Sequence, residues 1–147
     1  SERYEKVFIF GAGPYEKEFA DYMAKKYKDV VSVIDRLKLS AELDLLSNLD
    51  VMVSMDSSSM QMASLMGVPV VSIWGATHPY GGNYPLGQPL SRAVQIELPC
   101  RPCSADGSKS CMYKDYRCLR RIAPSSVLLQ VVQTVDPVKP VSSKEPE

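Results

Sequence analysis

Short apolar runs alternate with amphipathic stretches along this chain, a pattern typical of alternating strands and helices. The runs are rich in Val, Ile and Met, which suits buried strands. They predict strands over residues 6–10, 30–34, 51–55, 70–74 and 93–98. The remaining stretches repeat apolar residues every three or four positions, which predicts helices over 15–28, 40–49, 60–66 and 127–132. Because the connections are short, this order predicts an α/β fold, a Rossmann-like parallel sheet flanked by helices.

Polar turns follow the third and fourth predicted strands. Residues 56–59 read Asp-Ser-Ser-Ser, and residues 75–78 read Gly-Ala-Thr-His. The carboxyl ends of neighbouring parallel strands lie at one edge of a sheet, where open α/β sheets bind ligands. Two interpretations of the serine cluster stand. It caps the next helix and serves stability alone, or it also offers the free N–H groups of that helix to a phosphate. The second turn favours the phosphate site.

These motifs, taken together, resemble the C-terminal signature of glycosyltransferase family 9, which contains the lipopolysaccharide heptosyltransferases. The match reads DSSSMQMA at 56–63, GVPVV at 67–71 and GATHP at 75–79. Two positions depart from the family: Ser58 stands where it has glycine, and Gln61 where it has histidine. Glutamine donates a hydrogen bond but carries no charge to a diphosphate. The resemblance spans roughly residues 7–132 and implies the C-terminal half of a GT-B glycosyltransferase.

The resemblance also implies a nucleotide-sugar donor site. Its residues would be Asp56, Ser57, Ser58, Ser59, Gln61, Thr77, Glu16 and Leu39. Those of the two turns would lie at the diphosphate or ribose, Glu16 near the ribose or base, and Leu39 in a loop against the base. Read without the resemblance, Glu16 is equally a first-turn carboxylate that compensates the helix dipole. Leu39 is equally a loop residue folded onto the sheet.

The activity implied by the resemblance is transfer of heptose or another sugar from an NDP-sugar to a lipopolysaccharide-type acceptor in bacteria. ADP-heptose is the implied donor, and a lipid-linked saccharide is the implied acceptor. No cofactor is required for this catalysis. The catalytic base would belong to an N-terminal domain that this sequence lacks, so no catalytic residue is expected here. We therefore expect a piece of a longer enzyme that is inactive by itself.

The family's C-terminal domain opens with one more strand and helix, which this sequence also lacks. In a sheet of order 3-2-1-4-5-6 that strand would be the central one. Either the remaining strands close the gap, or the fragment associates to cover an exposed edge.

Charge and hydropathy exclude two classes of partner. The 17 Lys and Arg residues balance the 17 Asp and Glu residues, so no overall field attracts nucleic acid. No apolar run approaches the ~20 residues of a membrane span. No signal peptide precedes the first strand, and we expect a cytoplasmic protein. The inner face of the inner membrane is the alternative for the full-length form.

A cysteine-rich loop is predicted over residues 99–119, within a single domain over 1–135. Its cysteines are Cys100, Cys103, Cys111 and Cys118. A C-x2-C pair is typical of tetrahedral zinc sites, so a structural zinc is one interpretation. Disulfides and free thiols are the other two. Residues 136–147, rich in Pro, Ser and charge, are predicted to be a disordered tail.

Two functions from other classes compete with the transferase. One is a flavodoxin-like binding module, and the other is a zinc-stabilised interaction module without catalysis. A flavodoxin-like receiver would need an acidic cluster at its strand ends, which the sequence lacks. Stoichiometric metal without nucleotide affinity would favour the zinc module. A hydrolase of the Ser-His-Asp type is excluded, because His78 is the only histidine and it lies in a Pro-containing turn.

Overall fold

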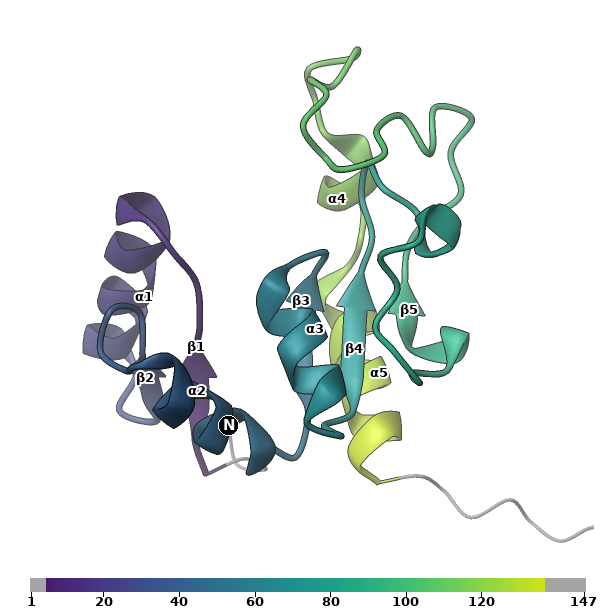
Figure 1. Cartoon of the computed structure of the whole chain (residues 1–147). Helices are drawn as coiled ribbons and strands as arrows, with labels where there is room; N and C mark the ends of the chain where they lie inside the picture. Colours follow the sequence, from purple (N-terminus) through teal and green to yellow (C-terminus); the bar gives the residue numbers. More distant parts are fainter. Residues whose placement is uncertain (1–4, 137–147) are drawn as a thin grey trace, which may run out of the picture. The chain divides into compact units, whose positions relative to one another are not determined.

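The computed structural model describes residues 5–136, and it divides the chain into two compact units. Unit 1 is Ser1–Asn48 and unit 2 is Leu49–Glu147, where the sequence predicts a single domain over 1–135. Strands and helices alternate in each unit, and every strand pair is parallel (Figure 1). The predicted α/β class is therefore confirmed. The tail predicted to be disordered lies, beyond Asp136, outside the described residues.

The described residues of unit 1, 5–48, form two strands and two helices. They are β1 (Val7–Ile9), α1 (Pro14–Lys26), β2 (Val30–Ser32) and α2 (Leu39–Ser47). β1 pairs with β2 in register, Val7 opposite Val30. Pro14 suits the first turn of α1, where no N–H is needed. Ala20, Ile34 and Leu46 are buried and form the small core of the unit.

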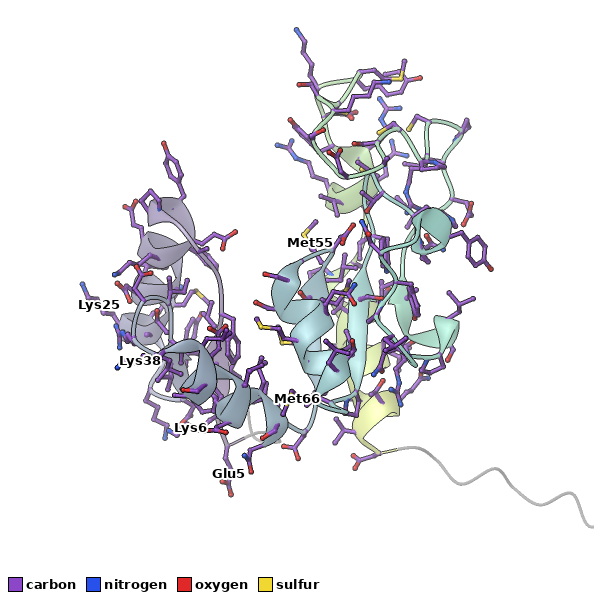
Figure 2. The ribbon with its side chains drawn as sticks, viewed as in Figure 1. Glu5, Lys6, Lys25, Lys38, Met55 and Met66 are labelled. Carbon is purple, nitrogen blue, oxygen red and sulfur yellow. The ribbon has the colours of Figure 1, made fainter. Side chains whose placement is uncertain are left out.

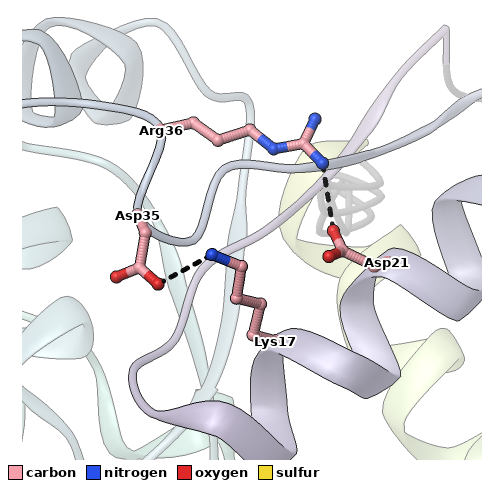
Figure 3. A network of polar contacts seen from close by, with 4 residues as sticks. All are labelled: Lys17, Asp21, Asp35 and Arg36. Atoms are coloured by element: carbon pink, nitrogen blue, oxygen red, sulfur yellow. Dashed lines mark hydrogen bonds and ion pairs between the residues drawn. The ribbon is translucent and has the colours of Figure 1, made fainter.

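Two ion pairs tie α1 to the turn after β2 (Figure 3). Lys17 Nζ lies 3.0 Å from Asp35 Oδ2, and Arg36 Nη2 lies 3.0 Å from Asp21 Oδ1. All four side chains are partly or well exposed. Exposed pairs of this kind contribute only about 0–1 kcal/mol each, so the buried apolar residues hold the unit together.

Unit 2 contains a three-stranded sheet of order β3-β4-β5. Its larger elements are β3 (Met52–Met55), α3 (Ser58–Leu65), β4 (Val70–Ile73), β5 (Ala93–Val94), α4 (Arg117–Arg120) and α5 (Pro124–Val135). Two short 3-10 helices, η1 (Pro79–Gly81) and η2 (Leu90–Arg92), lie between β4 and β5. α3 contacts both β3 and β4, and α5 contacts β4 and β5. Within the part of the chain that the structure describes, no helix is long and apolar enough to cross a membrane.

The core of unit 2 lies along β4. Val70, Val71 and Trp74 are fully buried, as is Met60 of α3. Trp74 Nε1 donates to Ser72 Oγ over 2.8 Å, so both buried polar groups are satisfied. The carboxyl ends of β3 and of α3 are less protected. Met55 closes β3 and Met66 caps α3, and both side chains are more than 40% exposed (Figure 2).

The strands form two sheets, β1-β2 and β3-β4-β5, in place of the single sheet predicted. Among the strands described, β1 pairs with β2 alone and β3 with β4 alone.

The bounds of each predicted element shift by one or more residues in the structure, and two of these shifts change how a predicted feature is described. Leu39, predicted in a loop, is the first residue of α2, whose N-cap is Lys38. The strand predicted over 93–98 is only Ala93–Val94. The chain leaves the sheet at Gln95 because this residue and Ile96 are acceptors for the Arg101 side chain.

Candidate functional site

Both predicted polar turns leave the same edge of the unit 2 sheet. β3 and β4 are parallel and in register, with Met55 opposite Ile73. The first turn follows Met55 and the second follows Trp74. The prediction that the two turns lie next to each other at one sheet edge is therefore confirmed.

The first turn is a formed helix cap. Ser57 has extended backbone angles, and its Oγ accepts from the Met60 N–H over 3.2 Å. The same Oγ shares a hydrogen bond of 2.9 Å with Ser54 Oγ. The capping interpretation is thus confirmed for Ser57, whose hydroxyl is committed to α3. Ser58 and Ser59 are the first two helical residues, so their N–H groups have no partner within the helix.

Asn83 ties the loop after η1 to this turn, a contact that no sequence pattern predicts. Its Nδ2 donates to Asp56 Oδ2 over 3.3 Å, and its carbonyl accepts from Gln61 Nε2 over 2.7 Å. Two of the predicted site residues are therefore brought together by one residue of the loop. One amide N–H of Gln61 donates in this contact, while its side-chain carbonyl oxygen and its second amide N–H take no part in it.

The loop has two further anchors. Tyr84 stacks on Trp74 with ring centroids 5.9 Å apart, and its hydroxyl donates to the Pro89 carbonyl. Burial raises the pKa of Tyr84 above its ordinary value, against smaller opposing effects. Gln88 accepts from the Val70 N–H at the far end of the loop. Both anchors follow Asn83, so the loop is held to the sheet directly after this residue.

The second turn is closely packed. Gly75 and Thr77 are buried, and His78 Nδ1 accepts from the Tyr80 N–H to cap η1. A Cβ added at Gly75 would lie 2.7 Å from Leu119 Cγ of α4. Only glycine fits here without displacing the leucine. His78 is a turn residue, as the sequence predicts.

The cysteine-rich loop packs on the other side of the second turn. Arg101 donates to the carbonyls of Gly75 and Thr77, and the N–H groups of Cys103 and Ser104 donate to the Ala76 carbonyl. The peptide bond between Arg101 and its following proline is cis. The sequence showed these residues only as members of a polar loop, and no pattern in it marked Arg101.

The remaining two predicted site residues lie in unit 1. The Glu16 carboxylate accepts from the Ala12 N–H over 2.8 Å and so closes the turn before α1. A Cβ at Gly11 would meet the same carboxylate oxygen at 2.4 Å, which explains the glycine. Leu39 is 62% exposed at the start of α2. The structure describes unit 1 by itself, so the roles of Glu16 and Leu39 toward a nucleotide stay predictions.

None of the four cysteines, all of which lie in the described residues, forms a disulfide. Cys118 is buried in α4, and the other three are partly exposed. Within residues 5–136, no group of three or more His, Cys, Asp or Glu side chains is arranged to hold a metal. The zinc interpretation therefore rests on sequence spacing alone. Backbone N–H groups, that of Tyr116 above all, donate to the Cys111 sulfur and hold the pKa of this thiol below its ordinary value.

Comparison with known proteins gives one match. The model of the family described as "Glycosyltransferase family 9 (heptosyltransferase)" matches residues 1–117. Neither the curated proteins nor the solved structures contain a match to this chain. The family match spans most of unit 2 and all of unit 1, and it confirms the family predicted from the motifs.

Proposed function

We propose that this chain, which belongs to glycosyltransferase family 9, is the part of a sugar transferase that holds the nucleoside diphosphate of the donor. Family membership establishes a glycosyltransferase; the donor-binding role of this chain is the proposal. The site would lie where β3 and β4 end, at the first turn of α3 and at residues 75–78.

One observation carries the proposal. The two turns leave one edge of a parallel sheet, and the first opens a helix with free N–H groups at Ser58 and Ser59. A helix N-terminus favours an anion through these N–H groups and through its dipole. In sugar transfer the leaving diphosphate gains negative charge as the bond to the anomeric carbon breaks. N–H groups fixed in advance by the Ser57 cap stabilise that charge without reorganising.

The side chains divide between two tasks. Ser58 and Ser59 would meet the phosphates through N–H and hydroxyl groups, with Gln61 and Thr77 beside them. Asp56 repels a phosphate, so its carboxylate is suited to accept from ribose hydroxyls instead. The amide of Asn83 already orients that carboxylate. Glu16 and Leu39 would serve the ribose and base, as the resemblance implies.

The finer parts of the proposal rest on the family alone. The donor would be an NDP-sugar, ADP-heptose before others, and the acceptor a lipid-linked saccharide of lipopolysaccharide type. The catalytic base would come from a separate N-terminal domain, so this chain alone would lack transferase activity. The full-length enzyme would act in the bacterial cytoplasm or at the inner face of the inner membrane.

Tryptophan fluorescence offers a direct test. The single tryptophan, Trp74, immediately precedes the second turn, so nucleotide binding there should alter its emission. ADP, UDP and GDP would be titrated in turn, with excitation at a wavelength that nucleotides do not absorb. We expect saturable binding of at least one of them, ADP before the others.

A charge variant separates binding from folding. Ser58→Asp adds a carboxylate to the first turn of α3, which favours the helix but repels a phosphate. We expect ADP affinity to fall more than about tenfold while the unfolding midpoint is kept or raised. Ser125→Asp, in the first turn of α5, is the matched control and should bind as the unmodified chain does. Equal affinity of Ser58→Asp and the control would refute the site. Stoichiometric zinc with no nucleotide affinity would favour the interaction module instead.

A further inference from the structure

We infer that Arg101 is a positioning residue of the proposed donor site, which it serves by turning the backbone N–H groups of residues 76–78 toward the ligand. This inference rests on the proposed function and adds a second set of anion-binding groups to it. Arg101 would not touch the nucleotide. It would act through the turn that follows β4.

Four of the five N–H donors of the Arg101 guanidinium are engaged. Nε donates to the Gly75 carbonyl and Nη2 to the Thr77 carbonyl, the latter over 3.2 Å. Nη1 donates to the Ile96 carbonyl, and Nη2 also to Gln95 Oε1 over 3.0 Å. The side chain is half-buried, and Gly75 and Thr77 are buried. One side chain thus fixes two peptide planes of the turn against the chain segment after β5.

The cysteine-rich loop fixes a third peptide plane of the turn, the one that contains the Ala76 carbonyl, from the side on which Arg101 lies. The Ala76 carbonyl accepts from the Cys103 N–H over 3.0 Å and from the Ser104 N–H over 3.3 Å. All three carbonyl oxygens of residues 75–77 therefore face Arg101 and its loop. Carbonyl oxygens repel a phosphate, so this arrangement removes them from the ligand side.

The N–H groups must then face the opposite way. In a trans peptide the N–H of one residue points opposite to the carbonyl of the residue before it. The N–H groups of Ala76, Thr77 and His78 consequently point away from the guanidinium and the cysteine-rich loop. Among residues 5–136 none of these three N–H groups has an acceptor. Backbone N–H groups without a partner are costly unless water or a ligand accepts from them, and successive ones form an anion-binding concavity.

An arginine is needed for this task, and a positive charge is not sufficient. The planar fork reaches four acceptors from three nitrogen atoms, whereas lysine has one nitrogen atom at the end of a flexible chain. Arg101→Lys therefore keeps the charge and releases at least one peptide plane. Arg101→Ala empties the space of the guanidinium, which a small guanidinium ion can fill again.

The test compares ADP affinity among four proteins at a temperature well below unfolding. They are the unmodified chain, Arg101→Lys, Arg101→Ala and the control Arg121→Lys, which changes an exposed arginine of the same unit. We expect both Arg101 variants to bind ADP about tenfold or more weakly and the control to bind normally. Methylguanidinium at low millimolar concentration should restore affinity to Arg101→Ala, and methylammonium should not. A residue that served stability alone would not give this rescue.

Amide chemical shifts separate the possible failures. On adding ADP to Arg101→Lys, the shifts of residues 57–61 should persist while those of 76–78 are lost. If ADP binds the unmodified chain and Arg101→Lys equally well, the role of Arg101 is refuted and the donor site stands. If the unmodified chain binds none of ADP, UDP and GDP, the proposed function fails, and this inference with it. If Arg101→Ala does not fold, the ADP affinities of Arg101→Lys and Arg121→Lys still decide whether Arg101 has this role.

Discussion

Replacing Gly75 by alanine tests how tightly the second turn is packed. The added Cβ would lie 2.7 Å from both Cγ and Cδ2 of Leu119 and 3.2 Å from its Cδ1. Carbon atoms in contact normally lie about 3.5–4.0 Å apart, so the overlap is close to ~1 Å. Overpacking of this kind costs about 1–3 kcal/mol. Gly75 does not have a positive φ, so alanine also recovers about 0.4–1 kcal/mol from the unfolded chain.

At the midpoints of these two ranges, the net effect is a free energy of unfolding lower by about 1.3 kcal/mol. Leu119 borders an apolar groove of about 480 Å³ together with Val53, Ile73 and Val131. This space lets the leucine turn partly aside, which favours the lower part of the overpacking range. Urea unfolding followed by Trp74 fluorescence measures the change, because this tryptophan is buried in unit 2 next to the turn.

Two further variants test whether the clash with Leu119 causes the loss of stability. Gly81→Ala is the matched control, since a Cβ there meets no atom within 4 Å, and it should leave stability unchanged or slightly higher. Leu119→Ala removes the atoms that Gly75→Ala would strike. In the Leu119→Ala variant, the loss of unfolding free energy caused by Gly75→Ala should be at least ~0.5 kcal/mol smaller than in the unmodified chain. An equal cost in both backgrounds, or no cost in either, would refute the packing argument.

Single side chains give four further predictions. Ser72→Ala should lower the free energy of unfolding by about 1–3 kcal/mol, because the buried indole N–H loses its acceptor. Ser32→Ala should not lower the free energy of unfolding, because Ser32 Oγ is buried without a partner in the described chain. Urea unfolding followed by circular dichroism compares the two variants, and a loss for Ser32→Ala as large as that for Ser72→Ala would contradict this expectation. Iodoacetamide at neutral pH should label Cys111 first, because backbone hydrogen bonds to its sulfur lower its pKa, and buried Cys118 last. Peptide mapping that found uniform labelling would count against these assignments. The pKa of Tyr84 is raised in the folded state, so the stability it contributes is complete below about pH 10 and lost as the pH rises further. Tyr84→Phe should flatten the alkaline fall in urea midpoint, and an unchanged slope would exclude this cause.

The local parts of the fold were readable from the sequence. Each strand and helix predicted here exists, because hydrophobic periodicity reflects which face of an element is buried. The cap at Ser57 was readable for the same local reason, since a hydroxyl residue before a helix accepts from its first turn. The two turns then follow from parallel strand order, which places both at one sheet edge.

The long-range polar contacts were not readable. Asn83 reaches Asp56 across 27 positions, and Arg101 reaches Gly75 across 26. No spacing rule connects residues so far apart, because their meeting depends on the whole path of the loop. The same cause explains the short β5, where Ile96 accepts from Arg101 instead of continuing the sheet. The start of α2 at Leu39 was missed because its N-cap, Lys38, is not a residue type that marks a helix start.

Amide-shift titration of the isotope-labelled chain with ADP, then UDP and GDP, decides whether the donor site exists. We expect saturable shifts at Ser57–Gln61 and at residues 75–78, with the nucleotide that binds best identifying the donor class. Glu16 should respond as well if the resemblance holds for unit 1. Shifts that appear only elsewhere, or none at millimolar concentrations of all three nucleotides, would contradict a donor site at the ends of β3 and β4.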